Sequence, residues 1–313
     1  MAHAVESMMF AGDVPWHGLG NKIPDGLTDI AAGMKAAGLD WEVQLIPLFT
    51  TDGREVTHRG VERKTDGSIL GVVGPRFVPL QNHEAFEWFQ PFLESGEAYL
   101  HTAGALKGGS RIWVLAKLDR DPLVIRPDDE VEKYLLLSHA HDGSLAVRVG
   151  FTPIRVVCNN TLTLAHEDSK SNLIRVKHSK STKVNLDNIR ATIDTIDRAF
   201  KATAEQYKLL AHKDINQKDV QRYVEFVFGL TEKPEEERSK QAERLVEDVM
   251  GRIYSASLGN GKGTVWDAYN GVTEYLSWKA GRNESTRFDS LWFGPNANLN
   301  QKALDTALEL VSA

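Results

Sequence analysis

A stretch rich in lysine and arginine is the part of this 313-residue sequence whose residue types indicate a chemistry most directly. It has no acidic residue between Ser169 and Leu186. Its five cations are Lys170, Arg175, Lys177, Lys180 and Lys183. Clustered cations attract phosphate groups through counterion release, whatever the base sequence, and aromatic side chains such as Tyr99, Trp113 and Phe151 can stack on bases. The stretch therefore predicts single-stranded DNA binding, whereas a solvated basic linker is the simpler alternative.

A glycine-rich loop, GNGKG at 259–263, offers a second possible phosphate contact. A nucleotide-binding P-loop requires four residues between its first glycine and a Gly-Lys-Ser/Thr end, and this loop lacks that spacing. Its backbone amides and Lys262 could still contact a nucleic-acid phosphate. The simpler interpretation is a flexible linker followed by a helix that Thr264 caps.

Two histidines and an aspartate occur together at 139–142. His139 and His141 are two residues apart, a spacing that places both side chains on one face of a strand. A transition-metal site needs three or four converging ligands, and no second cluster with ligand spacing is present, so we expect no metal. Asp142, followed by a glycine, is typical of a hairpin turn. A metal-dependent nuclease or hydrolase that uses His141, Asp142 and Arg155 stays open as an alternative.

Polar and aromatic residues from several separate segments define a candidate shared site. Arg155 lies in an apolar run, where an arginine requires an anionic partner, either a carboxylate or a phosphate. Cys158, in the same run, is typical of a small core residue. We expect six side chains to lie close together: Trp16, His17, His141, Asp142, Arg155 and Asn159. No Ser-His-Asp or paired-carboxylate signature is present, so catalytic residues are unknown, no cofactor is expected, and a binding protein is favoured over an enzyme.

Composition excludes several classes of protein. The single cysteine excludes an intramolecular disulfide. No window approaches 18 uninterrupted apolar residues, and the N-terminal residues lack a basic segment followed by an apolar run. We therefore expect a cytoplasmic protein without a signal peptide or a membrane span. The net charge of −6 excludes a strongly basic field over the whole molecule, so a nucleic-acid contact has to come from local charge.

The elements that would position these residues change in character near Lys183. Apolar residues alternate with period two from 41 to 164, with Asp-Gly pairs at turns, which predicts hairpins. From 186 onward, apolar residues recur at three-, four- and seven-residue steps, which predicts helices. The fold class is therefore α+β, with an antiparallel sheet and flanking helices first and a mostly helical C-terminal half.

This change also predicts the division of the chain into parts. We expect an antiparallel α+β domain over 1–168, within which residues 1–26 are irregular. A basic linker or loop follows over 169–185. A mostly helical region over 186–313 can pack on the first domain as one unit.

Five segments are similar to one known family: PWHGLG (15–20), VGPRFVPLQNHEAF (73–86), SHAHDGSLAV (138–147), TPIRVVCNNTL (152–162) and GTVWDAYNGVTEYL (263–276). Together they resemble the phage/plasmid-like protein family, a domain of unknown function, over nearly the full chain. The segment at 138–147 departs from the family by an extra His-Ala. The resemblance implies a mobile-element protein, encoded among DNA replication and recombination genes, and it implies no catalytic residues.

The order helix, three-stranded meander, helix over 28–94 is similar to the core of phage single-strand annealing proteins, the Erf and Red-beta class. Those proteins hold single-stranded DNA along a cationic groove in oligomeric rings. The similarity implies a homo-oligomer that binds or anneals single-stranded DNA without hydrolysis. A protein that binds and modulates a host partner is the third alternative.

Overall fold

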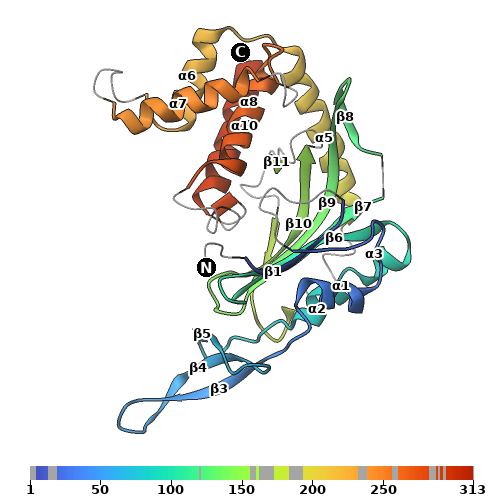
Figure 1. Ribbon diagram of the computed structural model, residues 1–313, viewed down its shortest axis with the longest axis vertical. Helices are drawn as coiled ribbons and strands as arrows, with labels where there is room; N and C mark the ends of the chain where they lie inside the picture. The colour runs from blue at the N-terminus through green and yellow to red at the C-terminus, as the bar shows by residue number, and fades with distance from the viewer. Residues whose placement is uncertain are drawn as a thin grey trace.

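The computed structural model describes residues 5–12, 20–119, 121–155, 160–161, 173–182, 193–231, 238–255, 260–281, 287, 290–291 and 294–312. Strands come first along the chain and long helices follow (Figure 1). The α+β class and the helical C-terminal half are therefore confirmed. Among the helices that the structure describes, none has both the length and the apolar character that a membrane crossing requires.

In the described part of the chain, the larger sheet, sheet A, has nine strands in the order β11-β10-β9-β7-β6-β1-β2, with β12 beside β10 and β8 beside β9. Its strands are β1 (Val5–Phe10), β2 (Asn21–Lys22), β6 (Ala98–Leu106), β7 (Arg111–Leu118), β8 (Leu123–Arg126), β9 (Asp129–Ala140), β10 (Val147–Arg155), β11 (Asn160–Thr161) and β12 (Leu173–Val176). The described pairings are antiparallel except β1 with β2.

Two of these strands correct the expectations from sequence. Residues 1–26 were expected to be irregular, but β1 pairs with β6 and contributes Met9 to the core. The basic stretch was expected to be a linker, but β12 pairs with β10 from Val147↔Val176 to Gly150↔Leu173. Both strands pair with partners distant in the sequence, so local patterns did not reveal them.

A smaller sheet, here called the arm, projects away from sheet A (Figure 1). It consists of β3 (Val43–Phe49), β4 (Glu55–Arg63) and β5 (Ile69–Val73), paired antiparallel in the order β3-β4-β5. At its base, the amide side chain of Gln81 accepts a hydrogen bond from the Val43 N–H and donates one to the Val43 carbonyl, both at 3.0 Å. This contact fixes the arm to the chain segment that begins the next helix.

Three short helices cover one face of sheet A (Figure 1): α1 (Ile30–Ala37), α2 (Asn82–Glu87) and α3 (Gln90–Glu94). They bury Phe86, Phe89 and Leu93 against alternate residues of the strands, such as Val114 and Leu137. This first core also includes the base of the arm, because it contains buried valines from β3, β4 and β5.

The C-terminal helices are α5 (Ile193–His212), α6 (Gln217–Val227), α7 (Lys240–Ile253), α8 (Val265–Trp278) and α10 (Pro295–Ser312). They surround α8, whose Trp266, Tyr269 and Leu276 are fully buried. The second core also contains Ile125 and Val131 from β8 and β9. The helices therefore pack against the β8–β9 end of sheet A.

Candidate nucleic-acid interface

The face of sheet A that α1, α2 and α3 do not cover changes from apolar to cationic along its strands. Trp113, Leu115 and Leu136 belong to a small apolar cluster on this face. Toward the end of β9, arginines occupy the same face, because side chains two residues apart on a strand share a face. They are Arg111 on β7, Arg148 on β10 and Arg175 on β12.

The sheet register brings these three arginines together. Arg148 lies directly opposite Arg175, and on its other side it lies opposite Ser138. Arg111 is one strand further, opposite Ala140, and its Nη2 donates a hydrogen bond to Ser144 Oγ at 3.2 Å. Burial lowers the pKa of Arg148 to about 10, and the charges of Arg175 and Arg111 contribute to this shift. We call these three residues the arginine cluster.

The turn that follows β12 adds exposed cations beside the cluster. Thr182 Oγ1 accepts from the Ser179 N–H at 2.8 Å and contacts the Lys177 carbonyl at 2.9 Å, which closes the turn. Lys177 and Lys180 are exposed. We call residues 177–182 the basic turn. Within the stretch that was expected to be a basic linker or loop, residues 173–182 therefore form a strand and a hydrogen-bonded turn.

Three cations of this edge, Arg175, Lys177 and Lys180, are exposed. Within the described part of the chain, no ion pair involves Arg175, Lys177 or Lys180. Lys107, in the β6–β7 turn, extends the positive region: burial and the nearby Arg111 charge lower its pKa, while Asp142 opposes the shift. Together these residues form a cationic edge suited to phosphate groups.

The expected stacking residues are not available on this surface. Trp113 is 3% exposed and Phe151 is 4% exposed, so neither can stack on a base in this structure. Tyr99 is half-buried. The expectation failed because Phe151 packs in the first core and Trp113 packs in the small apolar cluster of the other face, and alternation along a strand does not show which of its residues become buried.

One residue of the basic turn, His178, lies close to two histidines of the β9 end. The ring centroids of His139 and His141 are 4.7 Å apart, and that of His178 is 5.9 Å from His139 and 4.7 Å from Phe77. Within the described residues, neither ring nitrogen of His139 has a hydrogen-bond partner, whereas His141 Nε2 lies 3.1 Å from Asn82 Oδ1. Burial lowers the pKa of His139 well below its ordinary value and that of His141 to about 3. These imidazoles are therefore neutral.

The histidines do not extend into a metal site. Among the residues that the structure describes, no group of three histidine, cysteine, aspartate or glutamate side chains could hold a metal ion. Asp142 Oδ1 accepts a hydrogen bond from the Ser144 N–H at 2.8 Å, so its side chain stabilises the β9–β10 turn.

The described residues of the candidate shared site do not lie close together. Arg155 ends β10, whereas Asp142 precedes the start of that strand at Val147. Eight residues of extended chain span roughly 26 Å, so Arg155 and the Asp142 turn lie at opposite ends of the sheet. Trp16, His17 and Asn159 lie outside the described residues, as do Lys170 and Lys183 of the basic stretch.

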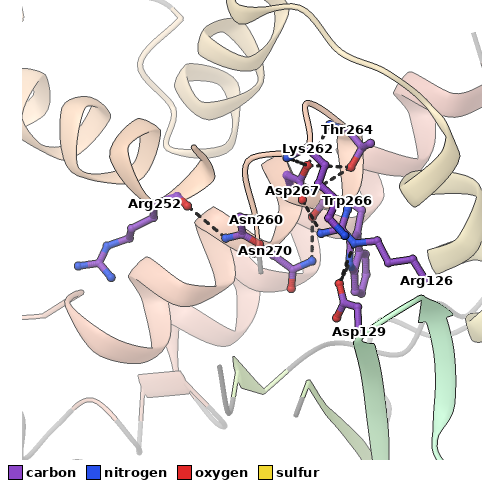
Figure 2. Close-up of polar contacts among 9 residues, drawn as sticks. All are labelled: Arg126, Asp129, Arg252, Asn260, Lys262, Thr264, Trp266, Asp267 and Asn270. Carbon is purple, nitrogen blue, oxygen red and sulfur yellow. Dashed lines mark hydrogen bonds and ion pairs between the residues drawn. The ribbon is translucent and has the colours of Figure 1, made fainter. Parts of the chain in front are cut away.

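Lys262 lies instead at a buried polar junction between sheet A and the helices (Figure 2). Asp267 Oδ2 accepts hydrogen bonds from the backbone N–H groups of Lys262 at 3.0 Å and Thr264 at 3.1 Å. These amides are therefore occupied by an internal carboxylate, while the Lys262 side chain is exposed. Thr264 caps α8, as expected, in a capping box with Asp267.

The same carboxylate also joins this loop to the β8–β9 hairpin (Figure 2). Arg126 Nη2 donates to Asp267 Oδ1 at 2.7 Å, and its Nε lies 3.1 Å from Asp129 Oδ2. Trp266 Nε1 donates to that Asp129 oxygen at 2.8 Å. All of these groups are nearly inaccessible to solvent. The junction is therefore a structural connection and not a phosphate cradle.

The sequence offered Arg175, Lys177 and Lys180 as candidate contacts, but it did not offer Arg111 and Arg148, which the structure places beside Arg175. The sequence pattern that could have revealed Arg148 is the alternation in VRVGF at 147–151. Arg148 stands between apolar residues there, so its side chain lies on the opposite face of the strand from theirs. The pairing of Arg148 with Arg175 depends on strand register, which sequence alone did not specify.

Comparisons with known proteins give a family but no function. No curated protein and no solved structure matches this chain significantly. Residues 69–292, which include the arginine cluster, the basic turn and the buried junction, match the family described as Domain of unknown function (DUF932). Since this match covers more than half of the sequence, the chain belongs to that family.

Proposed function

We propose that this protein binds single-stranded DNA without hydrolysing it, through the arginine cluster and the basic turn. The carrying observation is that Arg111, Arg148 and Arg175 gather on one sheet face, where burial and, to a smaller extent, the charges of Arg175 and Arg111 lower the pKa of the central Arg148. Like charges held close together on adjacent strands are destabilising. An anion bound between the three arginines would offset this repulsion, which supports an anion-binding site here.

The chemistry of the edge favours a phosphate backbone as that anion. Guanidinium groups donate paired hydrogen bonds to phosphate oxygens, and the exposed lysines of the basic turn add point charges along the same edge. Phosphate contacts do not depend on base identity, so we infer binding that is largely independent of sequence. A role in DNA replication or recombination of phages and plasmids is the biological context that we propose, with annealing as the step.

The salt dependence of binding tests this proposal. Each phosphate contact to a single strand contributes roughly 0.7 to the slope of log affinity against log salt. A triple variant, Arg175→Ala with Lys177→Ala and Lys180→Ala, should therefore lower the slope by about two. Fluorescence anisotropy with labelled single-stranded DNA of several sequences, titrated across salt, measures the slope, and all sequences should weaken alike.

A second triple variant provides the matched control. Arg54→Ala, Arg59→Ala and Lys64→Ala remove the same total charge from the arm, where these cations are already paired with Asp52, Glu55 and Glu42. The control should keep the wild-type slope. Absence of DNA binding by the wild type at about 50 mM salt, or an equal loss in both triple variants, would reject the proposal.

A further inference from the structure

Three turns lie at one end of sheet A, the end where the arginine cluster is found. The β6–β7 turn (107–110) and the β9–β10 turn (141–146) are joined by a hydrogen bond from the His141 N–H to the Ser110 carbonyl at 2.8 Å. The basic turn follows β12, which is antiparallel to β10 and therefore ends beside the start of that strand. In antiparallel pairing, the ends of β6, β9 and β12 reach the same end of the sheet.

The base of the arm lies directly against two of these turns (Figure 1). A Cβ at Gly71 of β5 would lie 2.5 Å from the Cα of Asp142, so only a glycine allows β5 to approach the β9–β10 turn this closely. Phe77, which follows β5, stacks on the ring of His178 in the basic turn, with the ring centroids 4.7 Å apart. The arm therefore supports the turns that carry the exposed cations.

Arg63, the last residue of β4, connects the arm to the third of these turns. Its Nη2 donates to the Gly108 carbonyl at 2.7 Å, and its two terminal nitrogens donate to the Glu6 carboxylate at 2.7 and 3.1 Å. The guanidinium carbon lies 4.5 Å from the ring centroid of Trp41, and Arg63 is 7% exposed. A guanidinium bound by a carboxylate, a carbonyl and an aromatic face has a fixed position. Arg63 therefore holds the β6–β7 turn against the arm.

The turn that Arg63 holds contains an exposed lysine in an unfavourable backbone conformation. Lys107 has a φ of 53°, and among the described residues Asp128 is the only other non-glycine residue with a positive φ. Glycine adopts this left-handed region freely, and asparagine and aspartate tolerate it, but lysine is disfavoured there. Such conformations persist where the surrounding structure fixes them, and they are concentrated at binding and active sites.

Lys107 lengthens the row of cations across this end of sheet A. Arg175, Arg148 and Arg111 lie on β12, β10 and β7, and Lys107 follows β6, so the arginine cluster lies between Lys107 and the basic turn. Neighbouring strands are about 4.8 Å apart, so the row from β12 to β6 covers roughly 19 Å. One phosphate group cannot contact both ends of this row, whereas successive phosphates of one nucleic-acid strand can.

We propose that Lys107 is a further phosphate-binding residue, at the end of this row opposite the basic turn, and that Arg63 is the positioning residue that holds Lys107 in place. The need for a charge then explains why the turn carries a lysine where glycine or asparagine would be more stable. Arg63 is buried and acts through the turn, without contacting DNA. This inference rests on the proposed DNA binding.

Lys107→Asn tests the first part, because asparagine removes the charge and tolerates the left-handed backbone. The salt slope of single-stranded DNA binding, measured by anisotropy, should fall by roughly 0.7, the contribution of one phosphate contact. The urea midpoint should be equal to that of the wild type or higher. Lys213→Asn is the matched control, because Lys213 is exposed between α5 and α6, and it should keep the wild-type slope.

A double-mutant cycle tests the positioning role of Arg63. Arg63→Lys keeps the charge but lacks the planar fork that contacts Glu6 and Gly108 together. It should lower the salt slope by up to roughly 0.7 in the wild-type background and leave the slope of Lys107→Asn unchanged. Glu6→Gln, at a partly exposed carboxylate, is a milder variant for which the same pattern is expected.

The outcomes separate this inference from the proposed function. A wild-type slope in Lys107→Asn would overturn the inference, while a lower slope in the Arg175, Lys177 and Lys180 triple variant would still support DNA binding at the cationic edge. An equal loss from Arg63→Lys in both backgrounds, or no loss in either, would overturn the positioning role. A wild type that does not bind DNA would overturn both proposals.

Discussion

Arginines occur at both ends of β9 in opposite electrostatic settings. Where β9 begins, Arg126 contacts Asp267 at 2.7 Å and Asp129 at 3.1 Å, and all three are buried. Where β9 ends, Arg148 lies opposite Arg175 and close to Arg111, and its pKa is lowered. The first setting stabilises charge with charge inside the protein, whereas the second collects like charge at an edge.

The difference separates a structural role from a binding role. A buried arginine that contacts two carboxylates needs no further ligand, so the junction holds sheet A and the C-terminal helices together. Crowded arginines are unfavourable for the free protein, and a bound anion would relieve their repulsion. The role of an arginine in a strand, structural or ligand-binding, can therefore be assigned only when the side chains around it are known.

Removing the carboxylate at the junction should have the largest effect. Asp267→Ala removes one of the two carboxylates that contact buried Arg126 and also removes the acceptor for two backbone amides. Breaking a buried ion pair from one side costs about 3–5 kcal/mol of unfolding free energy. Urea denaturation measures this loss, and Glu42→Ala, which breaks the exposed pair with Lys64, should leave the midpoint unchanged. Equal stability of Asp267→Ala and the wild type would contradict the structural role of the junction.

Histidine provides a third electrostatic setting, in which burial keeps the side chain neutral and no partner charge is needed. Burial, with a contribution from Lys117, lowers the pKa of His101 from 6.5 to about 4. The unfolded chain therefore binds this proton at higher pH than the folded chain, so stability is complete above pH 6.5 and declines toward pH 4. His101 alone should account for about 3 kcal/mol over this range.

The urea midpoint measured from pH 7 to pH 4 tests this decline. His101→Asn stays neutral at every pH and should make the decline smaller by the contribution of His101, while His139 and His141 keep theirs. His58→Asn, at an exposed position of the arm, should not change it. A wild-type midpoint that is constant over this range would show that the buried imidazoles do not resist protonation.

The smallest expected effect concerns Arg148, the counterpart of Arg126 at the cationic end. Arg148→Met should lower the salt slope of single-stranded DNA binding by roughly 0.7, the contribution of one phosphate contact. It should also reduce the unfolding free energy by less than Arg126→Met does, because the Arg148 side chain is only partly buried, whereas Arg126 lies in the buried junction. Anisotropy and urea denaturation measure the two quantities. A larger stability loss for Arg148→Met than for Arg126→Met would contradict the assignment of a structural role to Arg126 and a binding role to Arg148.

The sequence by itself determined the local elements and the change between the two halves. Period-two alternation predicted hairpins over 41–164, such as those from Val43 to Val73 and from Ala98 to Leu118, and helical spacing predicted helices beyond 186, of which α8 begins after the expected cap Thr264. These features depend on side chains within a few residues of one another, so they are readable from sequence.

Tertiary structure alone decided which of the charged and apolar residues meet. It placed β12 beside β10 and so aligned Arg148 with Arg175, it joined Asp267 to Arg126 across 141 residues, and it left Val72 exposed on the arm. Each of these outcomes depends on register or packing between segments distant in the sequence. A shift of one residue in register would turn every side chain of a strand to its other face, so residue type alone could not specify them.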